Sequence, residues 1–264
     1  MADPVYNAQV ICEQAKEAAE HGAKIVVFPE LCITGYTCND LFLQELLLEK
    51  AKEALLTIAE ETGQLETLFL VGLPVDKDGR LYNVAAVLYR GRILGMIPKK
   101  NIPMYAEFYE GRHFTPGEET VTEYRLGKQV IPFGSNLLFR CEELPELILG
   151  CELCEDLWVA EPPSTSHALM GATVIANLSA SNETVSKDDY RTLLIKASSA
   201  RLLCGYIYTS AGEGESTQDL VFGGHDLIAE NGTLLVQSAR FTTGILYTDL
   251  DVLKISSERR RMGT

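Results

Sequence analysis

Three reactive side chains in this sequence each follow a short apolar run. They are Glu30, Lys99 and Cys154, and the runs before them end in Phe28-Pro29, Ile97-Pro98 and Glu152-Leu153. Enzymes with α/β folds often place their chemistry at strand ends, because the rigid sheet aims the side chains while loops bind the substrate. A carboxylate, an amine and a thiol that converge there can serve as base, electrophile and nucleophile. The sequence therefore predicts a candidate catalytic site built from these three residues.

Each of these residues has an ordinary explanation when it is taken alone. A glutamate at a strand end is most often a solvated or capping carboxylate, and Lys99 beside Lys100 is typical of a surface pair. A single cysteine is more often a small buried apolar residue. The ordered combination of Glu30, Lys99 and Cys154 is what favours a catalytic site.

The pair Cys151 and Cys154 is formally a C-x-x-C motif, which allows a zinc site or a redox pair as alternatives. A structural zinc site needs a second ligand pair, and neither a second C-x-x-C nor two closely spaced histidines occur. We therefore expect no metal site. If 147–153 is a strand, the two cysteines have opposite parity and point to different faces.

An α/β fold must position these residues, because apolar runs of strand length alternate with segments of helical spacing. We expect helices over 7–22, 40–63, 166–170 and 189–203, with Asp40 capping the second. Strands are expected over 24–29, 67–75, 81–97 (turning at Arg90-Gly91-Arg92), parts of 120–140, 147–153, 173–179, 206–211 and 225–237 (turning at Asn231-Gly232), and 245–250 closes the fold. Without a linker or an internal repeat, residues 1–264 form a single predicted domain.

Composition and charge exclude several classes of protein. The chain is 46% hydrophobic and 23% charged, as in ordinary globular proteins, and its formal net charge of -14 argues against a nucleic-acid partner. No apolar run reaches the roughly 18 residues of a membrane span, and the N-terminus lacks the features of a signal peptide. The seven cysteines are therefore expected to be mostly reduced thiols in a cytoplasmic protein.

Four motifs resemble those of the nitrilase (carbon-nitrogen hydrolase) superfamily, over nearly the whole chain. They are FPELCITGY (28–36), PKKNIPMYAEFYEGRHF (98–114), CELCEDLW (151–158) and NLSASNE (177–183). The last three are most similar to the glutaminase domains of glutamine-dependent NAD synthetases.

The resemblance implies a four-layer α-β-β-α sandwich and a division of labour among the three reactive residues. It makes Glu30 the general base, Lys99 the cation that stabilises the transition state, and Cys154 the nucleophile. It also implies a glutamine pocket lined by Tyr36, Tyr105, Phe108, Glu155 and Ser181. These roles suit the hydrolysis of a carboxamide, which is a poor electrophile and needs a thiolate to attack it.

The chain departs from that family pattern at both ends. Family members begin with a strand ahead of the first helix, and MADPVYN leaves no room for it, so we expect the first strand to be missing. No phosphate-binding loop such as S-G-G-x-D-S is present. ATP and magnesium are therefore expected only in the synthetase domain that follows in such enzymes, and this chain is expected to use no cofactor.

Three functions remain open at this point. The first is a glutaminase that supplies ammonia to a synthetase domain, with glutamine, that domain and further copies of the chain as partners. The second is a stand-alone amidase that acts on another small carboxamide. The third is a non-catalytic oligomerising module of the same fold, which the intact set of Glu30, Lys99 and Cys154 disfavours.

Overall fold

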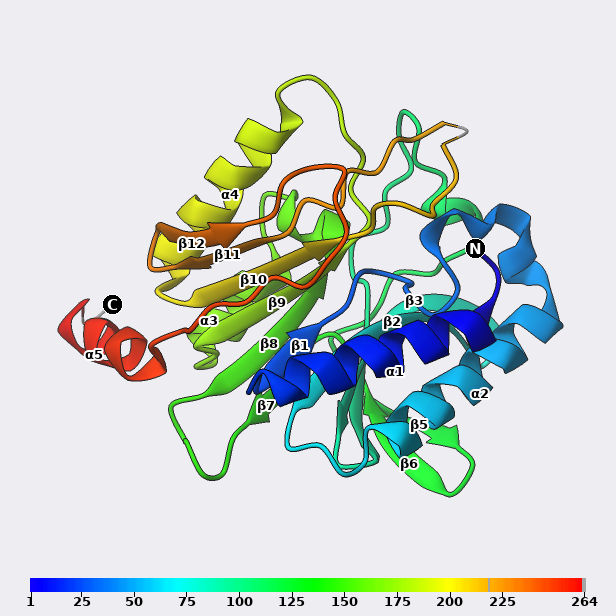
Figure 1. Cartoon of the computed structure of the whole chain (residues 1–264), viewed down its shortest axis with the longest axis horizontal. Coiled ribbons are helices and arrows are strands. Elements are labelled where there is room, and N and C mark those ends of the chain that lie inside the picture. The colour runs from blue at the N-terminus through cyan, green and yellow to red at the C-terminus, as the bar shows by residue number, and fades with distance from the viewer. Residues whose placement is uncertain (218, 263–264) are drawn as a thin grey trace.

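Two mixed six-stranded sheets form the centre of the protein in the computed structural model, which describes residues 1–217 and 219–262 (Figure 1). The first sheet has the order β1-β2-β3-β4-β6-β5 and the second β12-β11-β10-β9-β8-β7. The strands of the first sheet are β1 (Ile25–Val27), β2 (Leu68–Lys77), β3 (Arg80–Tyr89), β4 (Arg92–Pro98), β5 (Thr122–Leu126) and β6 (Gln129–Phe133). Those of the second are β7 (Leu138–Arg140), β8 (Ile148–Leu153), β9 (Val174–Ser179), β10 (Gly205–Ser210), β11 (Leu227–Glu230) and β12 (Thr233–Gln237).

Both faces of the central strands β2 and β3 of the first sheet are buried, with alternate residues serving the two faces, whereas β5 and β6 bury only one face. In β2, Phe69 and Val71 pack with Leu55 and Ile58 of helix α2 (Glu45–Glu61), which lies beside α1 (Pro4–Glu20). Leu70 points the other way and joins an apolar cluster shared with the second sheet. This period of two follows from strand geometry, and it explains why β2 reads as a continuous apolar run.

The second sheet is built in the same manner. Its residues Val174 and Ala176 face the first sheet, whereas Ile175 and Tyr206 pack against α4 (Lys187–Leu202) through Ile195. The short helix α3 (Pro163–Leu169) packs beside β8. Figure 1 shows α1 and α2 together on one side of the protein and α4 on the other. The two sheets are thus stacked face to face and flanked by helices.

Both tight turns predicted from the sequence are confirmed. Arg90 and Gly91 (φ 47° and 75°) join β3 to β4, and Asn231 and Gly232 (φ 45° and 85°) join β11 to β12. Two successive positive φ angles match the right-handed twist of the flanking strands, which is why Asn-Gly favours such hairpins. The predicted strands between 24 and 237 are present, with ends that differ by a few residues.

The prediction that Asp40 caps a helix is wrong. Residues Tyr36–Leu43 form a 3-10 turn, η1, and α2 begins only at Glu45. Asp40 instead accepts hydrogen bonds from Arg112 and lies 2.9 Å from His113, because these tertiary partners outcompete a local cap. The first helix also begins earlier than predicted, at Pro4, since Asp3 accepts a hydrogen bond from the Tyr6 amide at its N-terminus.

The end of the described chain differs from expectation as well. Residues 245–250 form neither helix nor strand, and an unpredicted helix, α5 (Val252–Met262), follows them. Arg259 fastens this helix by donating to the carbonyls of Leu202 and Leu203 at the end of α4 (2.9 and 2.8 Å). Ahead of α1 the described residues form no strand, and β1 lies at the edge of its sheet. Over residues 1–217 and 219–262, no helix is both long and apolar enough to cross a membrane.

Candidate active site

The three reactive residues lie at strand ends, as predicted. Glu30 comes shortly after β1, Lys99 directly follows β4, and Cys154 directly follows β8 of the second sheet. All three are buried, with exposed fractions of 0%, 0% and 5%. The Glu30 amide donates to the carbonyl of Ser179 at the end of β9 (3.2 Å), so the backbone ties the two sheets together beside the site.

Lys99 lies between two buried carboxylates. Its Nζ is 2.7 Å from Glu30 Oε1 and 2.6 Å from Glu110 Oε1. Asn83 Nδ2 donates to the same Glu30 oxygen at 2.7 Å, while Glu30 Oε2 has no partner among the described residues. Burial disfavours the charged ammonium, but the two carboxylates outweigh it and raise the pKa of Lys99. Lys99 is therefore a permanent cation in this site.

Glu30 is poised to exchange a proton near neutral pH. Burial raises the pKa of the Glu30 carboxyl to about 7, and the Lys99 charge only partly offsets this. Burial likewise raises the pKa of the Cys154 thiol to about 12, with a further rise from Glu30 and an opposing effect from Lys99. The resting form of Cys154 is thus the thiol, and it needs an adjacent base to become a nucleophile.

The backbone at Cys154 adopts an uncommon conformation. Its φ is 40°, in the left-handed region, where β8 passes into the 3-10 turn η3 (Cys154–Leu157). For a residue other than glycine this costs about 1 kcal/mol, and such positions are concentrated at functional sites. The turn is held by buried Asp156, which accepts from the amides of Leu153 (3.0 Å) and Asn101 (2.8 Å). Asp156 therefore joins the segment after Lys99 to the strand end before Cys154.

A cavity of about 440 Å³ opens beside Cys154. Four of the five predicted pocket residues line it: Tyr105, Phe108, Glu155 and Ser181. The Tyr105 hydroxyl lies 3.0 Å from a Glu155 carboxylate oxygen.

Lys187 also lines this cavity and was not predicted. Its Nζ lies 5.1 Å from the ring centroid of Trp158 and 5.7 Å from that of Phe108. Burial lowers the pKa of Lys187. The amine and the two rings form a cationic corner on the cavity wall.

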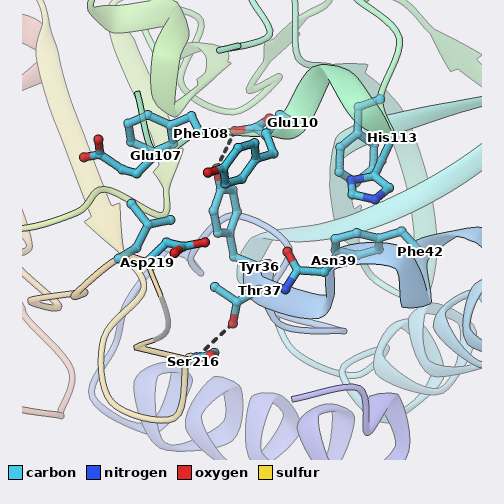
Figure 2. Close-up of a pocket in the computed structure, with 13 residues that line it drawn as sticks. Tyr36, Thr37, Asn39, Phe42, Glu107, Phe108, Glu110, His113, Ser216 and Asp219 are labelled. Atoms are coloured by element: carbon cyan, nitrogen blue, oxygen red, sulfur yellow. Dashed lines mark hydrogen bonds between the residues drawn. The ribbon is translucent and has the colours of Figure 1, made fainter. Parts of the chain in front are cut away.

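Tyr36, the fifth predicted pocket residue, lies elsewhere. It lines a second cavity of about 50 Å³, and its hydroxyl donates to Glu110 Oε1 at 2.8 Å (Figure 2). The structure therefore places Tyr36 behind Glu110, not on the wall of the larger cavity.

Glu110 and Asn83 are the main site residues that sequence reasoning missed. Glu110 lies in the motif 98–114, but the sequence analysis gave it no role. A signal was available, since a buried lysine requires a carboxylate partner and Glu107 and Glu110 were nearby candidates. Asn83 lies inside β3, and no pattern in the sequence distinguishes it from a solvent-facing strand residue.

The two cysteines of the C-x-x-C motif point to different places, as their parity predicts. Cys151 belongs to the apolar cluster between the sheets, whereas Cys154 lines the cavity. Across the described ranges, no group of three or more His, Cys, Asp or Glu residues is arranged to hold a metal ion.

Cys151→Ala is expected to keep the amide hydrolysis that the family resemblance implies within about twofold of the wild type. The buried Cys151 side chain packs in the apolar cluster between the sheets, with a long contact of 3.9 Å from its Sγ to the Glu152 carbonyl, so its loss leaves a small cavity that costs about 1 kcal/mol. Steady-state kinetics and urea unfolding measure the two effects. A loss of activity beyond tenfold in a stably folded variant would instead favour a zinc or redox role for Cys151 and Cys154 as a pair.

Comparison with known proteins places this site in context. The family model described as carbon-nitrogen hydrolase matches residues 1–260. The glutamine-dependent NAD(+) synthetase of Mycobacterium tuberculosis is 43% identical over 266 residues, covering 100% of this chain and 39% of that protein. The enzyme of the same name from Thermotoga maritima is 32% identical over 250 residues, covering 93% and 39%. This chain thus spans about 39% of the length of these relatives.

Solved structures give the same fold. A glutamine-dependent NAD(+) synthetase from Cytophaga hutchinsonii matches with a TM-score of 0.80 and 30% identity, covering 89% of this chain and 38% of that one. The NitN amidase from Neterenkonia sp. AN1 matches with a TM-score of 0.74 over 98% of this chain and 92% of that one. At 21% identity, the amidase supports the likeness of fold alone.

Proposed function

The chain belongs to the carbon-nitrogen hydrolase family, and on this premise we propose that it hydrolyses the side-chain amide of glutamine to glutamate and ammonia through a thioester on Cys154. The observation that carries this proposal is the buried Lys99, held between Glu30 and Glu110 at the strand ends beside Cys154. It unites a fixed cation, a carboxyl that titrates near pH 7 and a thiol in a water-poor site.

The reaction follows from these groups. Glu30 takes the thiol proton while Cys154 Sγ attacks the amide carbon, and Lys99 faces the charge that develops on the carbonyl oxygen. Lys99 has three N–H donors, and among the described residues two are used by Glu30 and Glu110, which leaves one for that oxygen. One such donor is worth about 3–4 kcal/mol. The proton on Glu30 then passes to the departing nitrogen, which leaves as ammonia.

Hydrolysis of the thioester reuses the same base. Glu30 takes a proton from water, and the resulting hydroxide attacks the thioester carbon. The carbon–sulfur bond breaks, glutamate is released, and the proton on Glu30 returns to Cys154. Each proton that Glu30 accepts is handed on within the same turnover, so the site ends in its starting state.

The larger cavity suits an amino acid with two charged groups. We propose that Lys187 and the Ser181 hydroxyl bind the α-carboxylate of glutamine, while Glu155 and Tyr105 bind its α-ammonium group. All four residues line the cavity that contains Cys154, and Phe108 and Trp158 supply its apolar walls. A smaller neutral carboxamide would leave Lys187 and Glu155 without partners. This disfavours the alternative in which the chain is an amidase of neutral substrates.

Its wider role rests on the relatives. In the glutamine-dependent NAD synthetases that it resembles, this chain corresponds to about 39% of the protein. We propose that it supplies ammonia to a synthetase domain that uses ATP and magnesium, and that it needs neither itself. The same resemblance favours homo-oligomers in the cytoplasm. Calorimetry in which this chain alone binds ATP tightly would contradict the proposal that only the synthetase domain uses ATP.

One experiment tests the proposed chemistry directly. Purified protein is incubated with glutamine, asparagine and propionamide, and the release of ammonia and of the acid product is measured. Glutamine should be preferred over the other two amides. A preference for propionamide would favour the stand-alone amidase, and no turnover of any amide, with Cys154 inert toward an electrophilic glutamine analogue, would favour a non-catalytic module.

The pH dependence of kcat/KM should show an acidic limb centred near pH 7. The pKa of Glu30 is about 7, so the base is ionised above this pH and protonated, hence unable to accept the thiol proton, below it. Activity should therefore fall about tenfold per pH unit in the acidic range. Glutamate release from pH 5 to 9, with circular dichroism to monitor folding, measures this. A profile that is flat from pH 5.5 to 8 would rule out Glu30 as the base.

A further inference from the structure

The loop between β10 and β11 holds the start of the 3-10 turn η1, far away in the sequence. The Glu215 carboxylate accepts hydrogen bonds from the amides of Tyr36 (2.7 Å) and Thr37 (2.9 Å) and from the Thr37 hydroxyl (2.6 Å). The Ser216 amide in turn donates to Thr37 Oγ1 at 2.8 Å, the contact drawn in Figure 2. The first backbone amides of a helical turn have no hydrogen-bond acceptor within that turn. Glu215 therefore accepts from donors that would otherwise be unpaired.

Gly35 makes this close approach possible. Its φ is 89°, and a Cβ at this position would lie 2.5 Å from Met1 Sδ and 3.5 Å from Glu215 Oε1. The chain therefore turns into η1 at a residue without a side chain, which presents the next two amides toward the carboxylate. The contact is a feature of the local backbone and not a chance encounter of two surface groups.

The same loop also holds the ring of Tyr36. Phe222 packs edge-on against it, with ring centroids 5.7 Å apart, and Tyr36 is only 8% exposed. Glu215 thus fixes the backbone of Tyr36 while Phe222 fixes its side chain. With both ends held, the direction of the Tyr36 hydroxyl is determined.

That hydroxyl acts on the proposed catalytic residues. It donates to Glu110 Oε1 at 2.8 Å (Figure 2). Lys99 donates to the same oxygen at 2.6 Å. A shift of Tyr36 would release Glu110, and Glu110 shares Lys99 with Glu30. We propose that Glu215 is a positioning residue, which acts through Tyr36 and Glu110 to fix Lys99 opposite Cys154. This inference rests on the proposed function for its catalytic consequence.

The test is a double-mutant cycle with two readouts. Wild type, Glu215→Gln, Tyr36→Phe and the double variant are compared for kcat and KM with glutamine. The rate at which chloroacetamide alkylates Cys154, located by peptide mass analysis, is measured in parallel. Glu213→Gln is the matched control, because Glu213 lies in the same loop, is exposed and loses the same charge.

In Glu215→Gln the side-chain oxygen can still accept from one backbone amide, but the side-chain NH2 group faces the other amide, and two donors cannot pair. Glu215→Gln should therefore lower kcat about tenfold with KM within twofold, and slow alkylation to a similar degree. In the Tyr36→Phe background the same change should have less than a twofold further effect, because the two residues act in series. Glu213→Gln should leave both rates unchanged.

Two outcomes would overturn the proposal. One is a Glu215→Gln variant whose kcat and alkylation rate lie within twofold of those of Glu213→Gln. The other is a full tenfold effect that persists in the Tyr36→Phe background. If the wild type hydrolyses no glutamine, the proposed function fails, whereas the alkylation series still decides whether Glu215 sets the reactivity of Cys154.

Discussion

Cys154→Ala is expected to abolish glutamine hydrolysis, with a loss of at least about 10⁴-fold, while the protein stays folded. Among the described residues that line the cavity, Cys154 is the only thiol; the hydroxyls of Ser181 and Ser186 and the Lys187 amine are intrinsically weaker nucleophiles. The stability cost should be below about 1 kcal/mol, because only one sulfur atom is removed and a neighbouring cavity already exists. Glutamate release and thermal unfolding measure the two quantities.

Covalent labelling provides the control for this result. A glutamine analogue with an electrophilic group should add one equivalent to the wild type at Cys154 and none to Cys154→Ala. Cys151→Ala should be labelled like the wild type, because Cys151 lies between the sheets, away from the cavity. Residual turnover above about 1% in Cys154→Ala would mean that another group is the nucleophile.

Lys99→Met should damage both activity and stability. Removing the cation deletes the donor that we propose for the carbonyl oxygen, and the loss of one such donor is expected to lower kcat by about 10²–10³. It also leaves Glu30 and Glu110 buried without a counter-charge, and breaking a buried ion pair costs about 3–5 kcal/mol. Methionine is chosen because it fills a similar volume without a charge.

The loss of stability should grow with pH. Without Lys99 the pKa of Glu30 should rise further, and a carboxyl whose pKa is raised in the folded state favours folding only while it is protonated. That contribution is complete below the ordinary pKa of a carboxyl and is lost as pH rises through the raised value. Urea unfolding of Lys99→Met at pH 5.5 and pH 8 should therefore show the smaller deficit at pH 5.5.

The adjacent lysine is a matched control. Lys100 pairs with Glu119 at the surface, where the side chains are 36% and 54% exposed, and such pairs contribute about 1 kcal/mol or less. Lys100→Met should therefore be nearly neutral at both pH values. Equal deficits in Lys99→Met and Lys100→Met would show that the buried ion pairs do not stabilise the fold.

Local signals in the sequence were sufficient for the strands and for the ends that carry Glu30, Lys99 and Cys154. Apolar runs of strand length and turn pairs such as Asn231-Gly232 depend on neighbouring residues only, and these predictions are confirmed. Asp40 has the chemistry of a helix cap, but Arg112 and His113 bind it from a distant segment. A rule that considers only neighbours along the chain cannot foresee that competition.

The remaining site residues were hidden for the same reason. Asn83 and Glu215 gain their importance from partners 53 and 179 residues away, and Glu110 contacts Tyr36, 74 residues away, as well as nearby Lys99. Helix α5 was missed because its anchors are tertiary contacts: Arg259 binds carbonyls at the end of α4, and Val252 and Ile255 are buried. Tyr36 was placed on the glutamine pocket by resemblance, and its position behind Glu110 depends on the loop that carries Glu215.

The division of the site between two sheets has a consequence for how the protein reaches its native state. Glu30 and Lys99 belong to the first sheet and Cys154 to the second, and the sheets meet through apolar side chains such as Leu70, Ile97 and Leu149. Neither sheet alone carries all three residues, so Cys154 meets Glu30 and Lys99 only when the two sheets dock. A partly folded chain therefore lacks the proposed site, which forms in the same event that buries the core.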